Sequence, residues 1–168
     1  MRPKIEIPNI TMLDYPCYVG PIISDKRILY IPYDGIYVNG KKKNIQKLAQ
    51  LDTIVSYVLE GYLDSNNKFH IYDCMSIHDW STKVGIKSYE DRLSDVRWIV
   101  NNFLFNTNEF IDSYMEIANN TGEFLDIYKK MLTSGSKGVI IRYINGCYSF
   151  NEPTSDFIEF KRGLKKNE

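Results

Sequence analysis

The sequence predicts an α+β domain built mainly on antiparallel sheet, because strand-like runs precede and follow a block of helical segments. Residues 17–38 read as extended segments, with a turn at Asp34-Gly35 and another directly after them at Asn39-Gly40, which is typical of a hairpin or meander. From Tyr89 to about Asn102 the apolar residues recur at helical spacing. Strand-like runs then close the chain, so we expect antiparallel sheets flanked by helices.

In the first half, residues 28–31 form a strand-like run that turns at 32–35 and runs back. Residues 41–50 fit a short helix with a charged outer face. A second hairpin is predicted next, because β-branched and aromatic residues dominate two runs on either side of a polar segment. These two runs are 53–63 and 69–77.

In the second half, Ser88 is a plausible N-cap for the helix that begins at Tyr89, with Glu90 and Asp91 favourable in its first turn. Two more amphipathic helices are predicted at 107–118 and 122–133. The three closing strands are predicted at Val139–Tyr143, Cys147–Phe150 and Phe157–Lys161.

At 168 residues the chain is long enough for a sizeable core, and we expect one domain spanning 1–168. It carries 21 acidic and 21 basic residues, which argues against a nucleic-acid binder held by bulk charge. The chain has neither a membrane-length apolar run nor a secretory signal pattern, so we expect an intracellular, cytoplasmic protein without membrane contact.

Cys17, Cys74 and Cys147 are odd in number and far apart, and we expect three buried, reduced thiols. Neither the cysteines nor the two histidines have metal-binding spacing, so no metal site is predicted. The chain is rich in Ile, Lys, Asn and Tyr, whose codons are AT-rich. That composition hints at an AT-rich genome, such as many viruses have.

Five segments, in this order, carry a resemblance to a known family. Their patterns in the family are L-D-G-E-L, F-x-x-F-D-[IL]-L, [PS]-Y-x-x-R-[LR], E-G-[IV]-[IV]-[IV]-[KR] and a strand ending K-x-K. The corresponding segments here are Leu59–Leu63, Phe69–Met75, Ser88–Leu93, Ser136–Arg142 and Ser155–Lys161. From about Tyr18 to Lys161 the chain therefore resembles the nucleotidyltransferase (adenylation) domain of ATP-dependent DNA ligases. The resemblance implies an ATP-grasp-like fold, and we expect the C-terminal OB barrel of that family to be lacking.

In this family the lysine of K-x-D-G-x-R attacks the α-phosphate of ATP and carries AMP as a phosphoramide. One register places Ile22 at the lysine and Ser24 at the aspartate, and keeps Arg27. The alternative register, Pro32–Gly35, places a proline at the lysine. Neither supplies the nucleophile. Lys26 is nearby but shifted along the chain, and an active ligase would have to use it or another lysine.

Three further groups of the family's site are replaced here. The glutamate that holds the ribose becomes Tyr62, the glutamate of the E-G motif becomes Lys137, and the first lysine of K-x-K becomes Glu159. Because the signs of the last two are exchanged, we hypothesise that Lys137 and Glu159 pair with each other. Arg142 and Lys161 stay basic, either as phosphate contacts or as solvated strand ends.

These replacements predict a catalytically inactive relative that acts by binding, as an adaptor, inhibitor or regulator. No cofactor is expected; ATP and Mg belong to the alternatives, an active ligase or a nucleotide sensor. A protein partner is favoured over nucleic acid. The tail residues Lys161, Arg162, Lys165 and Lys166 are candidate backbone or partner contacts. We also consider a catalytic His70 or His78, and a base-stacking surface formed by Tyr30, Tyr33, Tyr37 and Tyr62.

Overall fold

Two sheets form the frame of the computed structural model, which describes residues 13–51, 55–104, 108–148, 150 and 157–161. Of 157–161 it describes the backbone and the side chain of Glu159. The smaller sheet has the order β10-β9-β1-β8, with all neighbours antiparallel. Its strands are β1 (Cys17–Pro21), β8 (Glu116–Ala118), β9 (Gly138–Tyr143) and β10 (Phe157–Lys161).

The larger sheet has the order β4-β3-β2-β5-β6-β7, in which β7 runs parallel to β6 and the other neighbours are antiparallel. Glycine at 61 is required where β5 bulges, because a Cβ there would lie 1.9 Å from the backbone oxygen of His70. The strands are β2 (Arg27–Ile31), β3 (Gly35–Val38), β4 (Lys41–Lys43), β5 (Tyr57–Leu63), β6 (Phe69–Ser76) and β7 (Phe110–Asp112).

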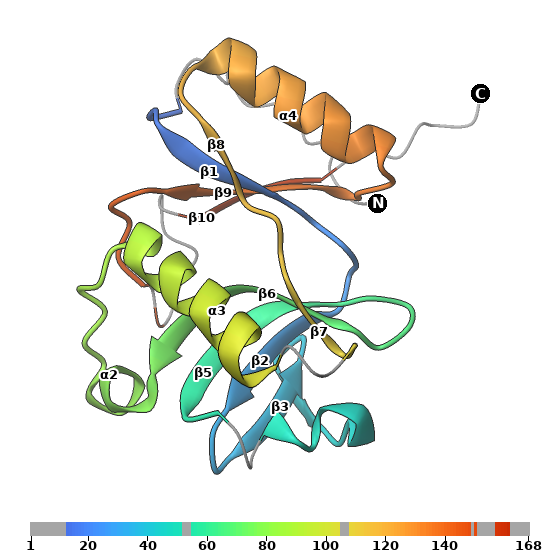
Figure 1. Cartoon of the computed structure of the whole chain (residues 1–168), viewed down its shortest axis with the longest axis vertical. Helices are drawn as coiled ribbons and strands as arrows, with labels where there is room; N and C mark the ends of the chain where they lie inside the picture. Colours follow the sequence, from blue (N-terminus) through green and yellow to red (C-terminus); the bar gives the residue numbers. More distant parts are fainter. Residues whose placement is uncertain (1–12, 52–54, 105–107, 149, 151–156, 162–168) are drawn as a thin grey trace.

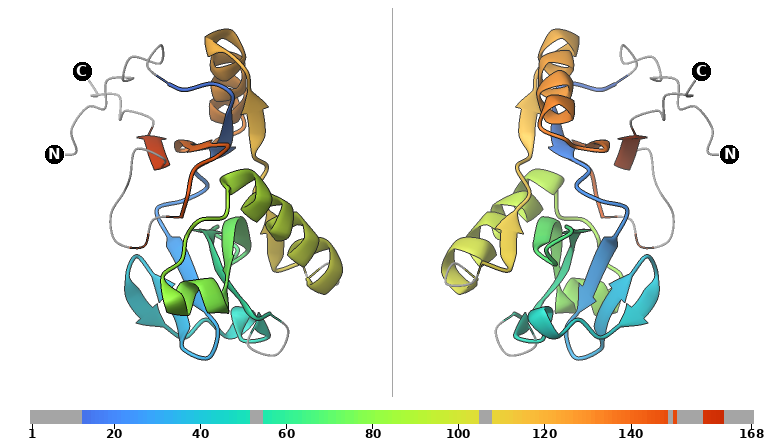
Figure 2. Two further views of the ribbon diagram at one scale, coloured as in Figure 1. Left: turned by 90° about the vertical axis from the view of Figure 1, so that its left-hand side faces the viewer. Right: turned by 90° about the vertical axis from the view of Figure 1, so that its right-hand side faces the viewer.

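Two long helices cover the sheets (Figure 1). Helix α4 (Thr121–Thr133) packs on β1, β8 and β9 of the smaller sheet, and α3 (Tyr89–Phe103) packs on β6 and β7 of the larger one. Figure 2 shows them on different sheets, with α4 at one end of the molecule. Two short helical segments, η2 (Gln46–Leu48) and α2 (Ile77–Thr82), lie beside the larger sheet.

The buried side chains form three clusters, one for each interface between layers. The first joins the larger sheet to α3 and the segment around η2, and the second joins the smaller sheet to α4. The third, which we call the inter-sheet cluster, contains residues from both sheets and from α3 and therefore lies where the sheets meet. Its members are Tyr18, Ile22, Tyr62, Tyr72, Tyr89, Leu93, Met115 and Ile140.

The predicted fold class is confirmed, and so are the hairpins, the helix from Tyr89, α4 and the strands β9 and β10. Ser88 caps α3 as predicted, because its side-chain oxygen accepts a hydrogen bond from the backbone N–H of Asp91. None of the helices in the described part of the chain is long and apolar enough to cross a bilayer.

Three predicted elements were wrong where the structure describes them. Residues 41–43 form an edge strand instead of a helix, and three lysines suit an exposed edge because they oppose further pairing. The predicted helix at 107–118 is replaced by β7 and β8, because pairing with β6 and β1 overrides local spacing. No strand forms at Cys147–Tyr148; the amide of Tyr148 instead donates to the carbonyl of Gly85.

Cys147 is exposed, which corrects the prediction that all three thiols are buried. Burial raises the pKa of the Cys17 thiol to about 11 and also raises the pKa of Cys74. Because the thiolate is the reactive form, we expect Ellman's reagent to titrate one thiol rapidly in the native protein and three in urea. Rapid reaction of all three native thiols would contradict this burial pattern.

Candidate functional site

The segment after β1 brings two of the family-like motifs into direct contact. The backbone N–H of Ile22 donates to the carbonyl of Gly138 over 3.0 Å, and the N–H of Lys137 donates to the carbonyl of Ile22 over 2.9 Å. The side chain of Ile22 is 1% exposed and belongs to the inter-sheet cluster. The residue aligned with the nucleophilic lysine is therefore an apolar core residue between the two sheets.

Tyr62, aligned with the ribose-binding glutamate, is buried in the same cluster with its ring 5.3 Å from that of Tyr72. Its hydroxyl donates to Glu159 Oε1 over 2.9 Å. Burial, together with the charge of Glu159, raises the pKa of Tyr62 and keeps it a neutral donor. The aromatic rings and Ile22 thus occupy the space where the sheets meet.

Lys137 and Glu159 do not pair with each other, so that hypothesis was wrong. Lys137 Nζ lies 3.2 Å from Asp25 Oδ2 in a pair that is about half exposed on both sides. Glu159 Oε1 lies 4.0 Å from Arg27 Nη1. The register of β9 and β10 explains the difference, because it places Glu159 opposite Ile140, whereas Lys137 precedes β9.

A buried charge network runs from α3 across both sheets. Arg92 makes a bidentate contact with Asp73, in which Nε lies 2.8 Å from Oδ1 and Nη2 lies 3.2 Å from Oδ2. Arg142 Nη2 lies 2.8 Å from Asp73 Oδ2 and 3.9 Å from Glu60 Oε2. Glu60 also accepts a hydrogen bond from Arg27 over 2.8 Å, and Arg27 forms a further ion pair with Glu159. The network alternates guanidinium and carboxylate groups, so each buried charge has an opposite neighbour.

Arg142 is not a solvated strand end, which was one of the two sequence interpretations. It is 5% exposed and joins the network from β9, on the smaller sheet, to Asp73 on β6 of the larger one. The backbone of Lys161 ends β10 opposite Gly138, and its side chain lies outside the description. Arg162, Lys165 and Lys166 also lie outside the described residues.

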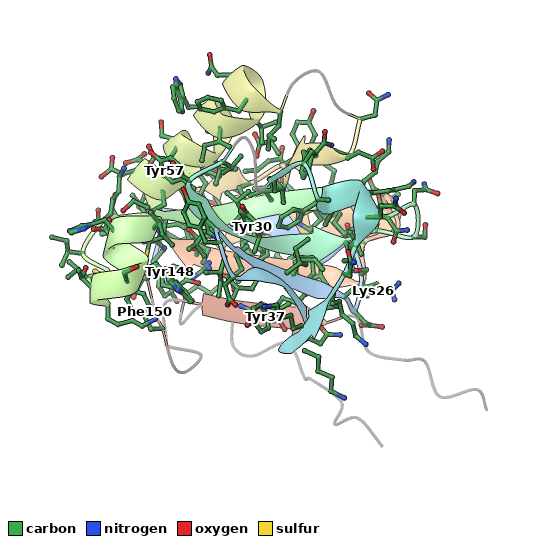
Figure 3. All side chains as sticks on the ribbon, turned by 90° about the horizontal axis from the view of Figure 1, so that it is seen from below. Lys26, Tyr30, Tyr37, Tyr57, Tyr148 and Phe150 are labelled. Carbon is green, nitrogen blue, oxygen red and sulfur yellow. The ribbon has the colours of Figure 1, made fainter. Side chains whose placement is uncertain are left out.

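The loop between β1 and β2 is held by Ser24, whose hydroxyl donates to the carbonyl of Leu63 and accepts from the N–H of Lys26. Lys26 itself is exposed, and Figure 3 shows it at the periphery of the molecule, opposite Tyr148 and Phe150. The residue proposed as an alternative nucleophile therefore does not reach the inter-sheet cluster.

The alternative register for the first motif lies at the turn between β2 and β3, away from the other motif positions. Asp34 in this turn accepts from Tyr37 over 2.9 Å and from Lys42 over 3.1 Å. Tyr33 is 88% exposed there. Only the register through Ile22 lies beside Lys137 and the inter-sheet cluster.

The predicted stacking surface does not form, since its four tyrosines lie in different environments. Tyr30 is buried in the core under the larger sheet and Tyr62 in the inter-sheet cluster, whereas Tyr33 is exposed. His70 Nε2 lies 2.9 Å from Asp64 Oδ2, and this local contact is typical of a histidine in a structural role. His78 is exposed on α2.

Sequence reasoning found the motifs that contain Glu60, Asp73 and Arg92, but it missed that these residues form one network. The signal was present, because a carboxylate or guanidinium inside an apolar strand or helix pattern requires a buried partner. Among the described residues, no group of three or more His, Cys, Asp or Glu side chains is arranged to hold a metal.

Comparison with solved structures matches the chain to DNA ligases. Chlorella virus DNA ligase-adenylate superposes with a TM-score of 0.68 and 20% identity, covering 92% of this chain and 64% of the ligase. The ATP-dependent DNA ligase of bacteriophage T7, in complex with ATP, gives a TM-score of 0.62 and 13% identity, covering 88% and 62%. The chain has the fold of the ligase nucleotidyltransferase domain. No family model and no curated protein sequence matches it.

A third match is mycobacterial DNA ligase D complexed with ATP and MES, with a TM-score of 0.63, 13% identity and coverage of 87% and 54%. The chain spans between 42% and 64% of the length of the ligase chains that it matches. At these identities the likeness establishes the ligase fold.

Proposed function

We propose that this ligase-like domain is catalytically inactive and acts by binding a macromolecular partner, as an adaptor, inhibitor or regulator. The observation that carries the proposal is the burial of Ile22 at the position that the resemblance assigns to the adenylate-accepting lysine. A nitrogen nucleophile is indispensable to that chemistry, because AMP must be held in a P–N bond that is labile enough to transfer it.

The surroundings of Ile22 support the same conclusion. Tyr62 and Tyr72 of the larger sheet and Ile140 of the smaller one belong to the same buried cluster as Ile22. A nucleotide placed between the sheets would have to displace these side chains and expose apolar surface to water, which is unfavourable. The ligase scaffold is therefore retained while the inter-sheet space is filled.

A protein is the favoured partner. The whole chain has no net charge, and its buried arginines at 92 and 142 are neutralised by carboxylates within the fold. A nucleic-acid partner requires basic side chains that neutralise phosphates, and it predicts a steep salt dependence of binding.

The proposal is tested first by incubating the protein with α-labelled ATP and Mg²⁺, followed by denaturing electrophoresis. We expect no label to remain on the chain, whereas an active DNA ligase run beside it becomes labelled. A labelled band that disappears with Lys26→Arg would establish the alternative of an active transferase using that lysine.

A pull-down from the native source, with and without nuclease, tests the binding half of the proposal. We expect specific capture of a protein that survives nuclease treatment. Capture that is lost after nuclease treatment would replace the protein partner with nucleic acid, and the absence of any specific partner would contradict an adaptor role.

A second candidate, a sensor that binds a nucleotide without transfer, has one observation in its favour. A hollow of about 420 Å³ lies over the face of β2, β3 and β5 that carries Arg27 and Glu60, and its lining also includes Leu29, Ile31, Tyr37 and Asn39. A nucleotide at a hundred times its dissociation constant would stabilise the protein by about 2.7 kcal/mol. A thermal-shift assay with ATP and GTP distinguishes the candidates, since the binding-only proposal predicts no shift.

A further inference from the structure

The open edge of β8 lies beside a hollow on the surface of the molecule. Strand β8 ends the smaller sheet, and among the strands that the structure describes it pairs with β1 alone, so none of them lies on its other edge. A hollow of about 550 Å³ is lined by residues of β8 and of its neighbours β1, α3 and α4; Figure 1 shows how these elements are arranged. Its lining comprises Tyr18, Arg97, Met115, Glu116, Ile117, Glu123, Asp126 and Ile127.

The lining residues come from both faces of β8. Met115 belongs to the inter-sheet cluster on one side, whereas Ala118 belongs to the core under α4 on the other. Ile117 shares the face of Met115 by strand alternation and is 43% exposed, and Glu116 shares the face of Ala118. Because the hollow takes in both faces, it wraps around the edge of the strand and fits an added strand better than a compact molecule.

The lining of the hollow combines apolar side chains, those of Met115, Ile117 and Ile127, with acidic ones. Three carboxylates, Glu116, Glu123 and Asp126, line it together with a single guanidinium, that of Arg97. Arg97 Nε lies 3.6 Å from Asp112 Oδ2, which reduces its influence on the groove.

The three carboxylates differ in their availability to a partner. Glu116 lies 2.6 Å from Lys130, and Glu123 caps the start of α4 by accepting from the N–H of Asn119. Asp126 is exposed and forms no ion pair with the residues that the structure describes. Asp126 is therefore the carboxylate most available to a basic group in the groove.

We propose that the edge of β8 binds an extended segment of a partner protein that alternates basic and apolar residues. The segment adds a strand to the smaller sheet, with backbone hydrogen bonds along β8. Its basic side chains lie on the side of Asp126, and its apolar side chains lie on the side of Ile117, as the alternation of a strand requires. This proposal rests on the proposed function, because it gives the chemistry of the protein partner.

The test uses a defined probe, a seven-residue peptide of alternating lysine and valine, titrated into the ¹⁵N-labelled protein. We expect saturable shifts confined to the amides of 115–118 and 123–127. Asp126→Arg should weaken binding roughly tenfold, which corresponds to replacing an attraction by a repulsion. The same charge change at Asp34, in the exposed turn of the larger sheet, should leave binding unchanged.

Two further peptides separate strand addition from attraction between charges. A glutamate–valine peptide should bind Asp126→Arg better than the wild-type protein. A lysine–valine peptide with every backbone nitrogen methylated keeps its charge but cannot donate to a strand, and it should not bind. Equal binding of the methylated peptide, shifts elsewhere, or no binding by the lysine–valine peptide would overturn the proposal. The labelled-ATP and pull-down assays test the proposed function separately, so failure of the peptide to bind does not by itself contradict that function.

Discussion

Replacing Asp73 with alanine is expected to remove about 3–5 kcal/mol from the free energy of unfolding, the cost of breaking a buried ion pair from one side. Asp73 is fully buried and accepts from both Arg92 and Arg142. Without it, two buried guanidinium groups lose their shared carboxylate. Urea denaturation followed by circular dichroism gives the change, which is a large fraction of the typical 5–15 kcal/mol total stability of a domain.

Asp126→Ala is the matched control, because it removes an exposed carboxylate on α4 and should change stability by no more than about 0.5 kcal/mol. Asp73→Asn keeps the shape of the side chain and loses only its charge. Its loss of unfolding free energy should therefore lie between that of the control and that of Asp73→Ala. It also provides a measurable variant if Asp73→Ala does not fold. Loss of less than about 1 kcal/mol in both Asp73 variants would contradict the structural role of the network.

Restoring a lysine at position 22 is expected to destabilise the protein by about 3 kcal/mol and to create no AMP adduct. The side chain at 22 is buried among Tyr62, Tyr72 and Ile140, so an ammonium there loses its hydration. The supporting groups are also absent, since Lys137 is paired with Asp25 and Glu159 accepts from Tyr62. Urea denaturation and labelled ATP measure the two effects separately.

Ile22→Met is the control for packing, because it keeps volume and polarity and should cost less than about 1.5 kcal/mol. The outcome that contradicts the account is a labelled Ile22→Lys protein. A label would mean that the space between the sheets still admits ATP and that only the nucleophile had been missing.

Much of the fold could be predicted from local signals. The Asn39-Gly40 turn, the Ser88 cap and the helical spacing after Tyr89 each depend on neighbours in sequence, and each was found where predicted. The segment around Phe110 and Ile117 was misassigned, because a few apolar residues fit helical and strand spacing equally well. Its structure is decided by β6 and β1, which are distant in sequence.

The sequence shows which residues of the family's site are replaced, but it does not predict the contacts that the replacing residues make. The exchange of signs at Lys137 and Glu159 suggested a pair, yet partner choice depends on the register of β9 and β10 and on Asp25 and Arg27, which lie far away in sequence. The burial of Ile22 between the sheets likewise depends on side chains from both of them. Such contacts are set by tertiary packing, which motif spacing does not encode.

The most direct measurement of the central claim titrates ATP with Mg²⁺ into the ¹⁵N-labelled protein and follows the amides of Ile22, Tyr62 and Ile140. We predict that these three resonances stay unchanged up to millimolar nucleotide, because their side chains already fill the space between the sheets. Saturable shifts centred on these three amides would show a nucleotide-binding cavity there and would contradict the account.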